Sequence, residues 1–157
     1  MSPASSSFVL GASFRLDAVS QSSGTDDGDN VVQVGRYSDE AQLKLDVDER
    51  SPACRVKGDQ GAVEVAATMQ VNATDWYRAE CRRDDSTVTL SVVQHLANHK
   101  VRTWIVSATG SIGSVMIPEG TPMSVGGKLD TDGEIDESSD QFNGHIDDVV
   151  LRTVREP

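Results

Sequence analysis

Aromatic residues and long hydrophobic runs are scarce in this sequence. Phenylalanine, tyrosine and tryptophan make up 4% of its 157 residues, and hydrophobic residues as a whole make up 37%. No apolar run approaches the ~18 residues that a membrane-spanning helix needs. The composition is therefore typical of a soluble protein. The length corresponds to one domain, residues 1–157, which is large enough to bury a sizeable core.

Basic residues are also few. The chain has 14 Lys and Arg against 25 Asp and Glu, which gives a formal net charge of −11. Because nucleic-acid binding depends on a basic surface that displaces counterions, this balance argues against a nucleic-acid partner. It suits an extracellular or periplasmic protein, or one that binds cations, although solubility alone also explains it.

The first residues lack the features of a secretory leader. The segment MSPASSSFVLGASF, residues 1–14, has neither a basic n-region nor a long apolar h-region. Two explanations stay open: the protein remains inside the cell, or Met1 begins a chain from which the leader has been omitted. With the charge and the cysteines taken into account, we expect a secreted or extracellular protein.

The sequence has only two cysteines, Cys54 and Cys81. Both lie in strand-like segments, ACRVKG and WYRAECRRD. An even pair in an acidic, strand-rich chain favours one disulfide. That bridge would close a loop of 27 residues (81 minus 54), worth roughly 3–4 kcal/mol in the chain-entropy model. The alternative is a pair of buried free thiols in a cytosolic protein.

Hydrophobic and polar residues alternate along most of the chain, which is the period of a β-strand. Leu43, Leu45 and Val47 alternate with charged residues, and no segment has a convincing helical period. Turn signals separate the strands, and a polar loop is predicted over residues 19–30. The sequence therefore predicts an all-β protein, either a two-sheet sandwich or a barrel. The first strand places these residues on one face: Phe8, Leu10, Ala12, Phe14 and Leu16.

Several short blocks occur in an order and spacing that resemble one known family. They are DWYR (75–78) with CRR (81–83), the strand 87–93, PMSVGG (122–127) and FNGHIDDV (142–149). Together they resemble the laminin G-like, concanavalin A-like jelly-roll family, and bacterial secreted members in particular. The resemblance covers residues 8–154 and implies a two-sheet antiparallel jelly-roll sandwich. Tyr77 departs from the histidine that the family often has there.

The last block carries two adjacent aspartates, Asp147 and Asp148, in the strand HIDDVVL. Strict alternation would place Ile146, Asp148 and Val150 on one face of that strand. Relatives often hold a structural calcium between the first strand, the loop after it and an aspartate of the final strand. The resemblance therefore implies one structural Ca²⁺ with Asp147 as a ligand. The alternative is that these carboxylates accept hydrogen bonds from turn amides or pair with Arg15.

Two acidic stretches look functional but lack the residues that the function needs. DTDGEID (130–136) has part of an EF-hand pattern, yet Ser139 stands where the bidentate glutamate belongs, and no helices flank it. EIDE (134–137) is similar to the catalytic strand of jelly-roll glycoside hydrolases. Because Glu137 directly follows Asp136, however, it points to the opposite face. We expect no catalysis from either stretch.

Three further expectations concern single sites. Trp76 and Trp104 lie in strands with apolar alternation, so we expect both in the core and not on a sugar-binding surface. Asn143-Gly144 predicts a tight turn. The three histidines are too scattered for a metal triad.

The sequence as a whole predicts a non-catalytic binding module. The expected ligand is a carbohydrate or cell-surface polymer, bound on the concave sheet or the loop rim, with no particular ligand-binding residue assigned. A protein-interaction or structural module within a larger assembly is the alternative, and a degenerate glycoside hydrolase is the third reading. Neither a nucleic-acid partner nor a membrane span is expected.

Overall fold

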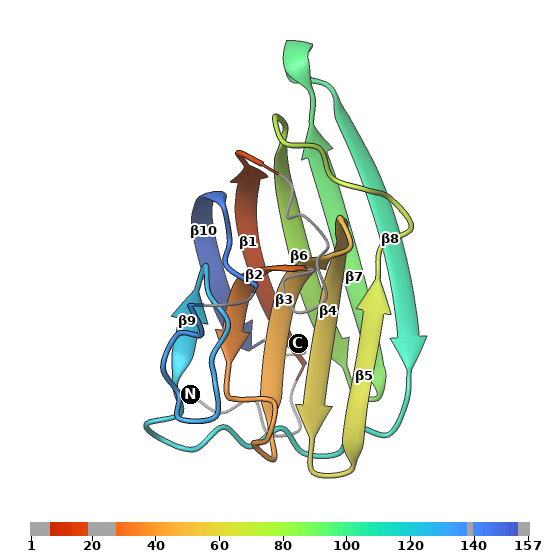
Figure 1. The fold of residues 1–157 in the computed structure, drawn as a ribbon. Coiled ribbons are helices and arrows are strands. Elements are labelled where there is room, and N and C mark those ends of the chain that lie inside the picture. The colour runs from red at the N-terminus through yellow and green to blue at the C-terminus, as the bar shows by residue number, and fades with distance from the viewer. Residues whose placement is uncertain (1–6, 19–27, 138–139, 154–157) are drawn as a thin grey trace.

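The computed structural model describes residues 7–18, 28–137 and 140–153 and forms two packed antiparallel sheets (Figure 1). The strand order in the first five-stranded sheet is β10-β1-β6-β7-β8, and in the second it is β5-β4-β3-β2-β9. The strands of the first sheet are β1 (Phe8–Leu16), β6 (Trp76–Asp84), β7 (Thr87–His95), β8 (Val101–Thr109) and β10 (Gly144–Thr153). Those of the second are β2 (Gly28–Val34), β3 (Gln42–Asp48), β4 (Ser51–Gly58), β5 (Gly61–Ala66) and β9 (Met123–Val125).

This architecture confirms the predicted all-β antiparallel sandwich. The only helical element among the described residues is a short 3₁₀ turn, Ala97–His99, in the connection between β7 and β8. No helix in the described part of the chain is long and apolar enough to cross a membrane. The loop predicted over residues 19–30 ends earlier than expected, because β2 already begins at Gly28; residues 19–27 lie outside the described part.

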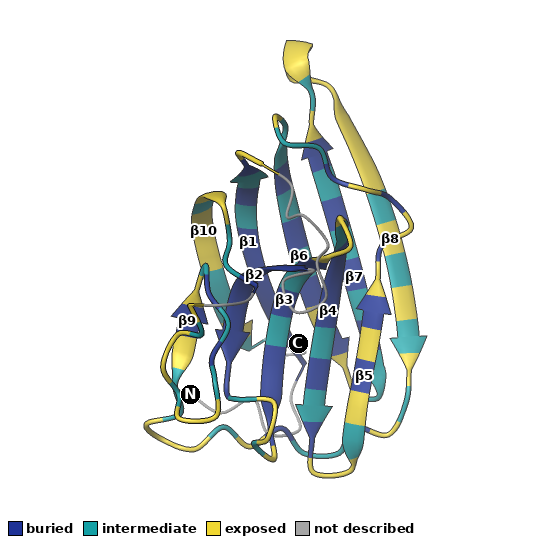
Figure 2. Ribbon diagram, in the orientation of Figure 1, coloured by how far each residue is buried: buried dark blue, intermediate teal, exposed yellow. Residues whose placement is uncertain are grey.

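The core lies between the two sheets and is mainly aliphatic. The alternating residues of β1 and β3 point into it, as the sequence predicts, and they are buried (Figure 2). Tyr77 is the largest of the fully buried side chains, and its ring stacks on that of Phe14 with the centroids 5.6 Å apart. Two rows of apolar side chains, one from each sheet, therefore fill the interior.

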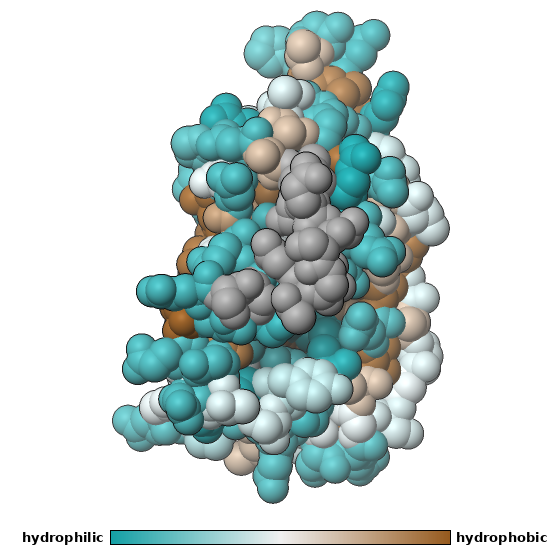
Figure 3. Space-filling view, viewed as in Figure 1, coloured by the Kyte–Doolittle hydropathy of each residue, from teal (hydrophilic) through white to brown (hydrophobic). Residues whose placement is uncertain are grey.

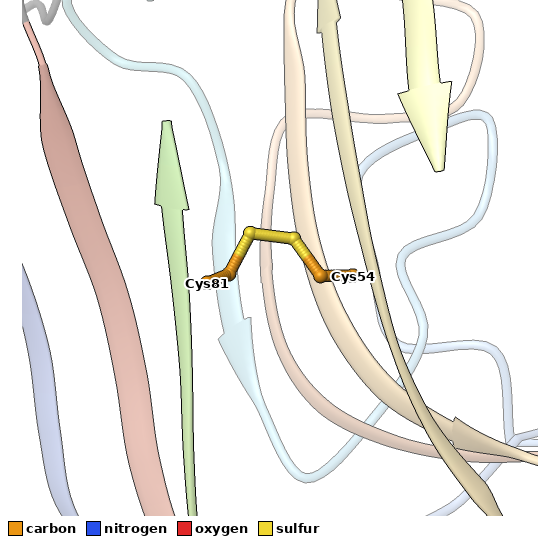
Figure 4. Close-up of a disulfide and its surroundings, with 2 residues drawn as sticks. All are labelled: Cys54 and Cys81. Atoms are coloured by element: carbon orange, nitrogen blue, oxygen red, sulfur yellow. A yellow bond between two sulfur atoms is a disulfide. The ribbon is translucent and has the colours of Figure 1, made fainter. Parts of the chain in front are cut away.

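A disulfide between Cys54 and Cys81 crosses this core (Figure 4). Cys54 belongs to β4 in one sheet and Cys81 belongs to β6 in the other, and their Cα atoms are 5.9 Å apart. That separation is in the usual range for a disulfide. The bridge therefore links the two sheets through strands that are central or next to central in each.

The final strand does not alternate as predicted, because it contains a β-bulge. Gly11 of β1 faces Val150, whereas Ser13 faces Asp147, so Asp148 and Val149 together oppose a single residue of β1. Ile146 and Leu151 both pack against the core although they are an odd number of residues apart. The extra residue reverses the alternation and corrects the expectation that Ile146, Asp148 and Val150 share one face of the strand.

Gly144 also has a different role from the one expected. The prediction was a tight turn at Asn143-Gly144, but Gly144 is the first residue of β10. A Cβ atom at this position would overlap the carbonyl oxygen of Arg15 on the neighbouring strand. Glycine is therefore needed because the two backbones approach closely, and not because a turn requires it.

Candidate functional site

A polar cleft lies on the outer face of the second sheet, on the side away from the core. It is a hollow of ≈ 230 Å³ across β2, β3 and β4. Alternation along β3 supplies part of its lining, because Leu43 and Leu45 point inward while Gln42 and Lys44 line the cleft. Figure 3 views the molecule from this side, and the visible part of the face is largely hydrophilic.

Strand β2 contributes to the cleft through a second irregularity. The register shifts between Asn30, which faces Asp46, and Val32, which faces Leu45. Val31 is therefore an additional residue, and it is buried in the core. As a result Asn30 and Gln33, three residues apart, both line the cleft. Simple alternation does not place residues three apart on the same face.

The amide side chains of the cleft are buried but incompletely hydrogen-bonded. Asn30 and Gln42 are 0% and 2% exposed. The Asn30 Nδ2 group donates to Gln33 Oε1 at 3.3 Å and to the Gly127 carbonyl oxygen. Within the described residues, however, Asn30 Oδ1, Gln42 Oε1 and Arg55 Nε have no hydrogen-bond partner. Buried polar atoms are nearly always paired, so this group of two acceptors and one donor is suited to a polar ligand.

Charged residues surround these amides, and carboxylates outnumber cations. Arg55 Nη1 lies 3.2 Å from Glu64 Oε2, and Lys128 Nζ lies 2.7 Å from Asp140 Oδ2. Lys44 pairs with Asp46. Burial raises the pKa of Asp46, and the Lys44 ammonium only partly offsets that effect. The acidic residues lining the cleft are Asp29, Asp46, Asp48, Glu64 and Asp140, and the basic ones are Lys44, Arg55 and Lys128.

An exposed aromatic ring stands at the edge of the cleft. Tyr37 is 71% exposed, the highest value among the exposed large hydrophobic residues. The guanidinium of Arg55 lies 5.0 Å from the ring centroid, and the ammonium of Lys57 lies 5.8 Å from it. Lys57 Nζ also donates to the Tyr37 carbonyl oxygen at 2.9 Å. These cation–π and hydrogen-bond contacts hold an otherwise solvent-exposed ring in place.

Asp147 lies away from the cleft, on the exposed edge strand β10. Its Oδ1 atom accepts a hydrogen bond from the Asp148 amide at 2.8 Å, which matches the alternative of a carboxylate that binds turn amides. Arg15 does not pair with either aspartate; it lies 3.5 Å from Asp17. Arg78 instead donates to the Asp148 carbonyl oxygen at 2.7 Å.

The predicted calcium site at Asp147 lies only partly within the described residues. Within the described ranges no group of three or more His, Cys, Asp or Glu side chains is placed to hold a metal. The calcium prediction also involves the residues that follow β1, and of these residues 19–27 lie outside the described part. Asp147 as a calcium ligand therefore stays a prediction.

The two tryptophans differ from each other. Trp104 packs against the core, as expected. Trp76 is only half-buried, and its ring lies near Arg15 and His145, with the Arg15 guanidinium 5.6 Å from its centroid. The neighbouring residue Tyr77 occupies the core position of this strand. The prediction that Trp76 lies in the core is therefore wrong, and the next residue, Tyr77, lies there instead.

The acidic loop after β9 folds on itself. Asp130 Oδ1 accepts hydrogen bonds from the amides of Asp132 and Glu134, at 2.8 and 3.0 Å. Leu129 forms an isolated bridge with Ile135. The carboxylate of Asp130 thus serves as an intraloop acceptor, as in an Asx-turn.

Comparison with known proteins identifies the class of this fold. The family model for the laminin G domain matches residues 31–154. The chain therefore belongs to the laminin G domain family. A search of curated proteins found no match.

Solved structures with the same fold include laminins and a carbohydrate-binding module. The LG1–3 region of the laminin α2 chain aligns with a TM-score of 0.70 at 11% identity over 93% of this chain. A Ruminococcus gnavus IT-sialidase CBM40 bound to α2,3-sialyllactose aligns with a TM-score of 0.64 at 10% identity, covering 96% of this chain and 77% of that one. The chain spans 27% of the laminin α2 structure and 39% of mouse laminin α1 LG4–5, which aligns with a TM-score of 0.63 at 11% identity.

Proposed function

We propose that this protein is a non-catalytic binding module that takes a neutral glycan or surface polymer in the polar cleft of β2, β3 and β4. The observation that supports this most is the set of buried polar atoms without partners: Asn30 Oδ1, Gln42 Oε1 and Arg55 Nε. Membership of the laminin G family, whose domains are generally binding modules, supports the class of function.

A sugar supplies the chemistry that these atoms require. Each hydroxyl group both donates and accepts, so neighbouring hydroxyls would donate to the two amide oxygens and accept from Arg55 Nε. The exposed ring of Tyr37 offers an apolar face on which a pyranose would stack. The excess of carboxylates disfavours an acidic sugar, which distinguishes this cleft from a site for sialyllactose.

Titration calorimetry with neutral oligosaccharides and with sialyllactose tests the proposal. We expect binding of a neutral glycan and none of sialyllactose. Tyr37→Ala should weaken binding at least tenfold with the fold intact, because the side chain is exposed. Gln60→Ala, an exposed glutamine outside the cleft, is the matched control. Equal binding by Tyr37→Ala and the native protein would exclude the cleft, and preference for sialyllactose would contradict the charge argument.

We place the protein outside the cell. Its disulfide supports this, since such bonds persist mainly in oxidising compartments. A protein-interaction role is the second candidate, and one specific surface favours it: the free edge of β8.

A further inference from the structure

The edge strand β8 is long and has neither a bulge nor a carboxylate, and its one charged residue is Arg102 near its start. Within the described residues it pairs only with β7, on one side, and that pairing runs from Val101 to Thr109 without a register shift. A long and regular edge strand without carboxylates presents a row of unpaired backbone groups, which is a template for another strand. Figure 1 shows β8 at the margin of the sandwich.

The other edges carry such protection. β9 has only three residues, and β5 has six residues with Glu64 among them. β10 is interrupted by its bulge and carries Asp147 and Asp148 there. Short length, bulges and charges each oppose strand addition. Of these four edge strands, β8 is therefore the least protected against pairing with a further strand.

The backbone groups available on β8 follow from its hydrogen bonds. The Gly110 amide donates to the Ser86 carbonyl oxygen at 3.0 Å, and the Leu96 amide donates to that of Lys100 at 2.8 Å. Because antiparallel pairing alternates, the even-numbered residues of β8 bond to β7. The N–H and C=O groups of the odd-numbered residues then point to the free edge. These are Val101, Thr103, Ile105, Ser107 and Thr109.

The side chains of these odd-numbered residues are apolar or neutral, and Arg102 is the one charged residue of the strand. Val101 and Ile105 are 57% and 67% exposed. On the other face of the strand, Trp104 and Val106 pack against the core but are only partly buried. Figure 3 shows pale and brown residues along this margin of the molecule. A strand added here would cover both sets.

The charge distribution favours a second copy of this chain as the partner. The chain carries −11 overall, so two copies repel each other over most of their surface. No Asp or Glu occurs between Asp85 and Glu119, the stretch that includes β7 and β8. Contact through β8 thus brings two acidic molecules together where neither has a carboxylate.

We propose that two copies pair antiparallel through β8, with a two-fold axis at Ile105, and so join their first sheets into one continuous sheet. In that register Ile105 faces its own counterpart and Thr103 faces Ser107. Arg102 faces Ala108 and Lys100 faces Gly110, so that no like charges are opposed.

This pairing is independent of the glycan cleft, which lies on the other sheet. A dimer holds two clefts, so on a repeating polymer the second binding event becomes intramolecular and the apparent affinity rises. The dimer and the cleft are therefore tested separately.

Oxidative cross-linking of two single-cysteine variants tests the register. Paired across the axis, the Cα atoms of position 105 would lie ~5.5 Å apart, which a disulfide spans. Position 101 would lie roughly 27 Å from its counterpart. We expect Ile105→Cys to cross-link rapidly and Val101→Cys, equally placed on the same edge, not to do so. The native cysteines are already bonded to each other.

Light scattering after size exclusion gives the second readout. The native protein should be dimeric, and Ile105→Lys should dissociate at least tenfold more readily because two lysines would face each other. Val149→Lys, at a 37% exposed position on β10, is the control and should stay dimeric. A native monomer, equal cross-linking at 101 and 105, or a dimer unaffected by Ile105→Lys would each overturn the proposal.

Discussion

The two edge strands of the first sheet differ in how well their free backbone groups are protected from pairing with another strand. β10 contains an extra residue, two adjacent carboxylates and a residue in the left-handed conformation, Asp148 with φ of 50°. β8 is regular over its whole length and carries no carboxylate. Because one sheet contains both, hydrophobic burial alone does not account for the difference. The comparison indicates that β10 is kept solitary and β8 is left open.

The largest expected effect concerns the disulfide, which lies far from either edge. Replacing both Cys54 and Cys81 with alanine should lower the free energy of unfolding by roughly 3–4 kcal/mol, because the bridge closes a loop with a sequence separation of 27. Urea denaturation measures this. If the edges act independently of the core bridge, the folded double variant should still dimerise. Loss of the dimer in a folded variant would show that edge and core are coupled.

A second prediction breaks the bulge of β10. Asp148→Val should cost about 1–2 kcal/mol, because a β-branched residue is disfavoured at positive φ. Asp148→Gly is the matched variant and should be neutral or slightly stabilising, since glycine adopts this conformation freely. Thermal unfolding of the two proteins under the same conditions checks this. Equal destabilisation by both would mean that the Asp148 side chain, and not its backbone conformation, matters.

A third prediction tests the register of the proposed β8 pairing through its cross-strand pairs. In the proposed register Thr103 of each copy faces Ser107 of the other, so the dimer contains this pair twice. Lysine at both positions should weaken the dimer, whereas Thr103→Glu combined with Ser107→Lys should strengthen it, each pair contributing ~0.2–1 kcal/mol. The dissociation constants should differ about tenfold. Indistinguishable constants would rule out this register.

The smallest expected effect distinguishes the two readings of Asp147. Asp147→Ala removes the acceptor of the Asp148 amide and should cost at most about 1 kcal/mol, because the hydrogen bond is exposed. If the carboxylate acts only in the bulge, the loss is the same in calcium and in excess chelator. A melting temperature that rises with calcium in the native protein, and no longer does so in the variant, would restore Asp147 as a metal ligand.

The sequence predicted the fold well where strands alternate without interruption. β1 and β3 have this pattern, and their core residues, such as Phe14 and Leu45, were predicted correctly. The prediction was wrong where a bulge adds a residue, because the side chains after the bulge then point to the opposite face from the one that strict alternation predicts. Both bulges matter: one reverses β10, and the other brings Asn30 and Gln33 to the same face.

The candidate cleft could not be predicted for a further reason. Its side chains come from separate strands. Arg55 and Lys44, for example, lie side by side only because β3 pairs with β4. Tyr37 gave no signal either, since a lone tyrosine after a strand does not reveal its exposure. The one available hint was the run of polar residues at alternate positions in β3, from Gln42 to Asp48.

Amide hydrogen exchange at low and high protein concentration tests the central claim, that β8 is the open edge, most directly. In the dilute protein the amides of Thr103, Ile105 and Ser107 should exchange quickly, while those of Trp104 and Val106 are protected by β7. At high concentration the first group should become protected, with no change along β10. If the amides of Thr103, Ile105 and Ser107 exchange equally fast at both concentrations, β8 does not pair and the account is contradicted.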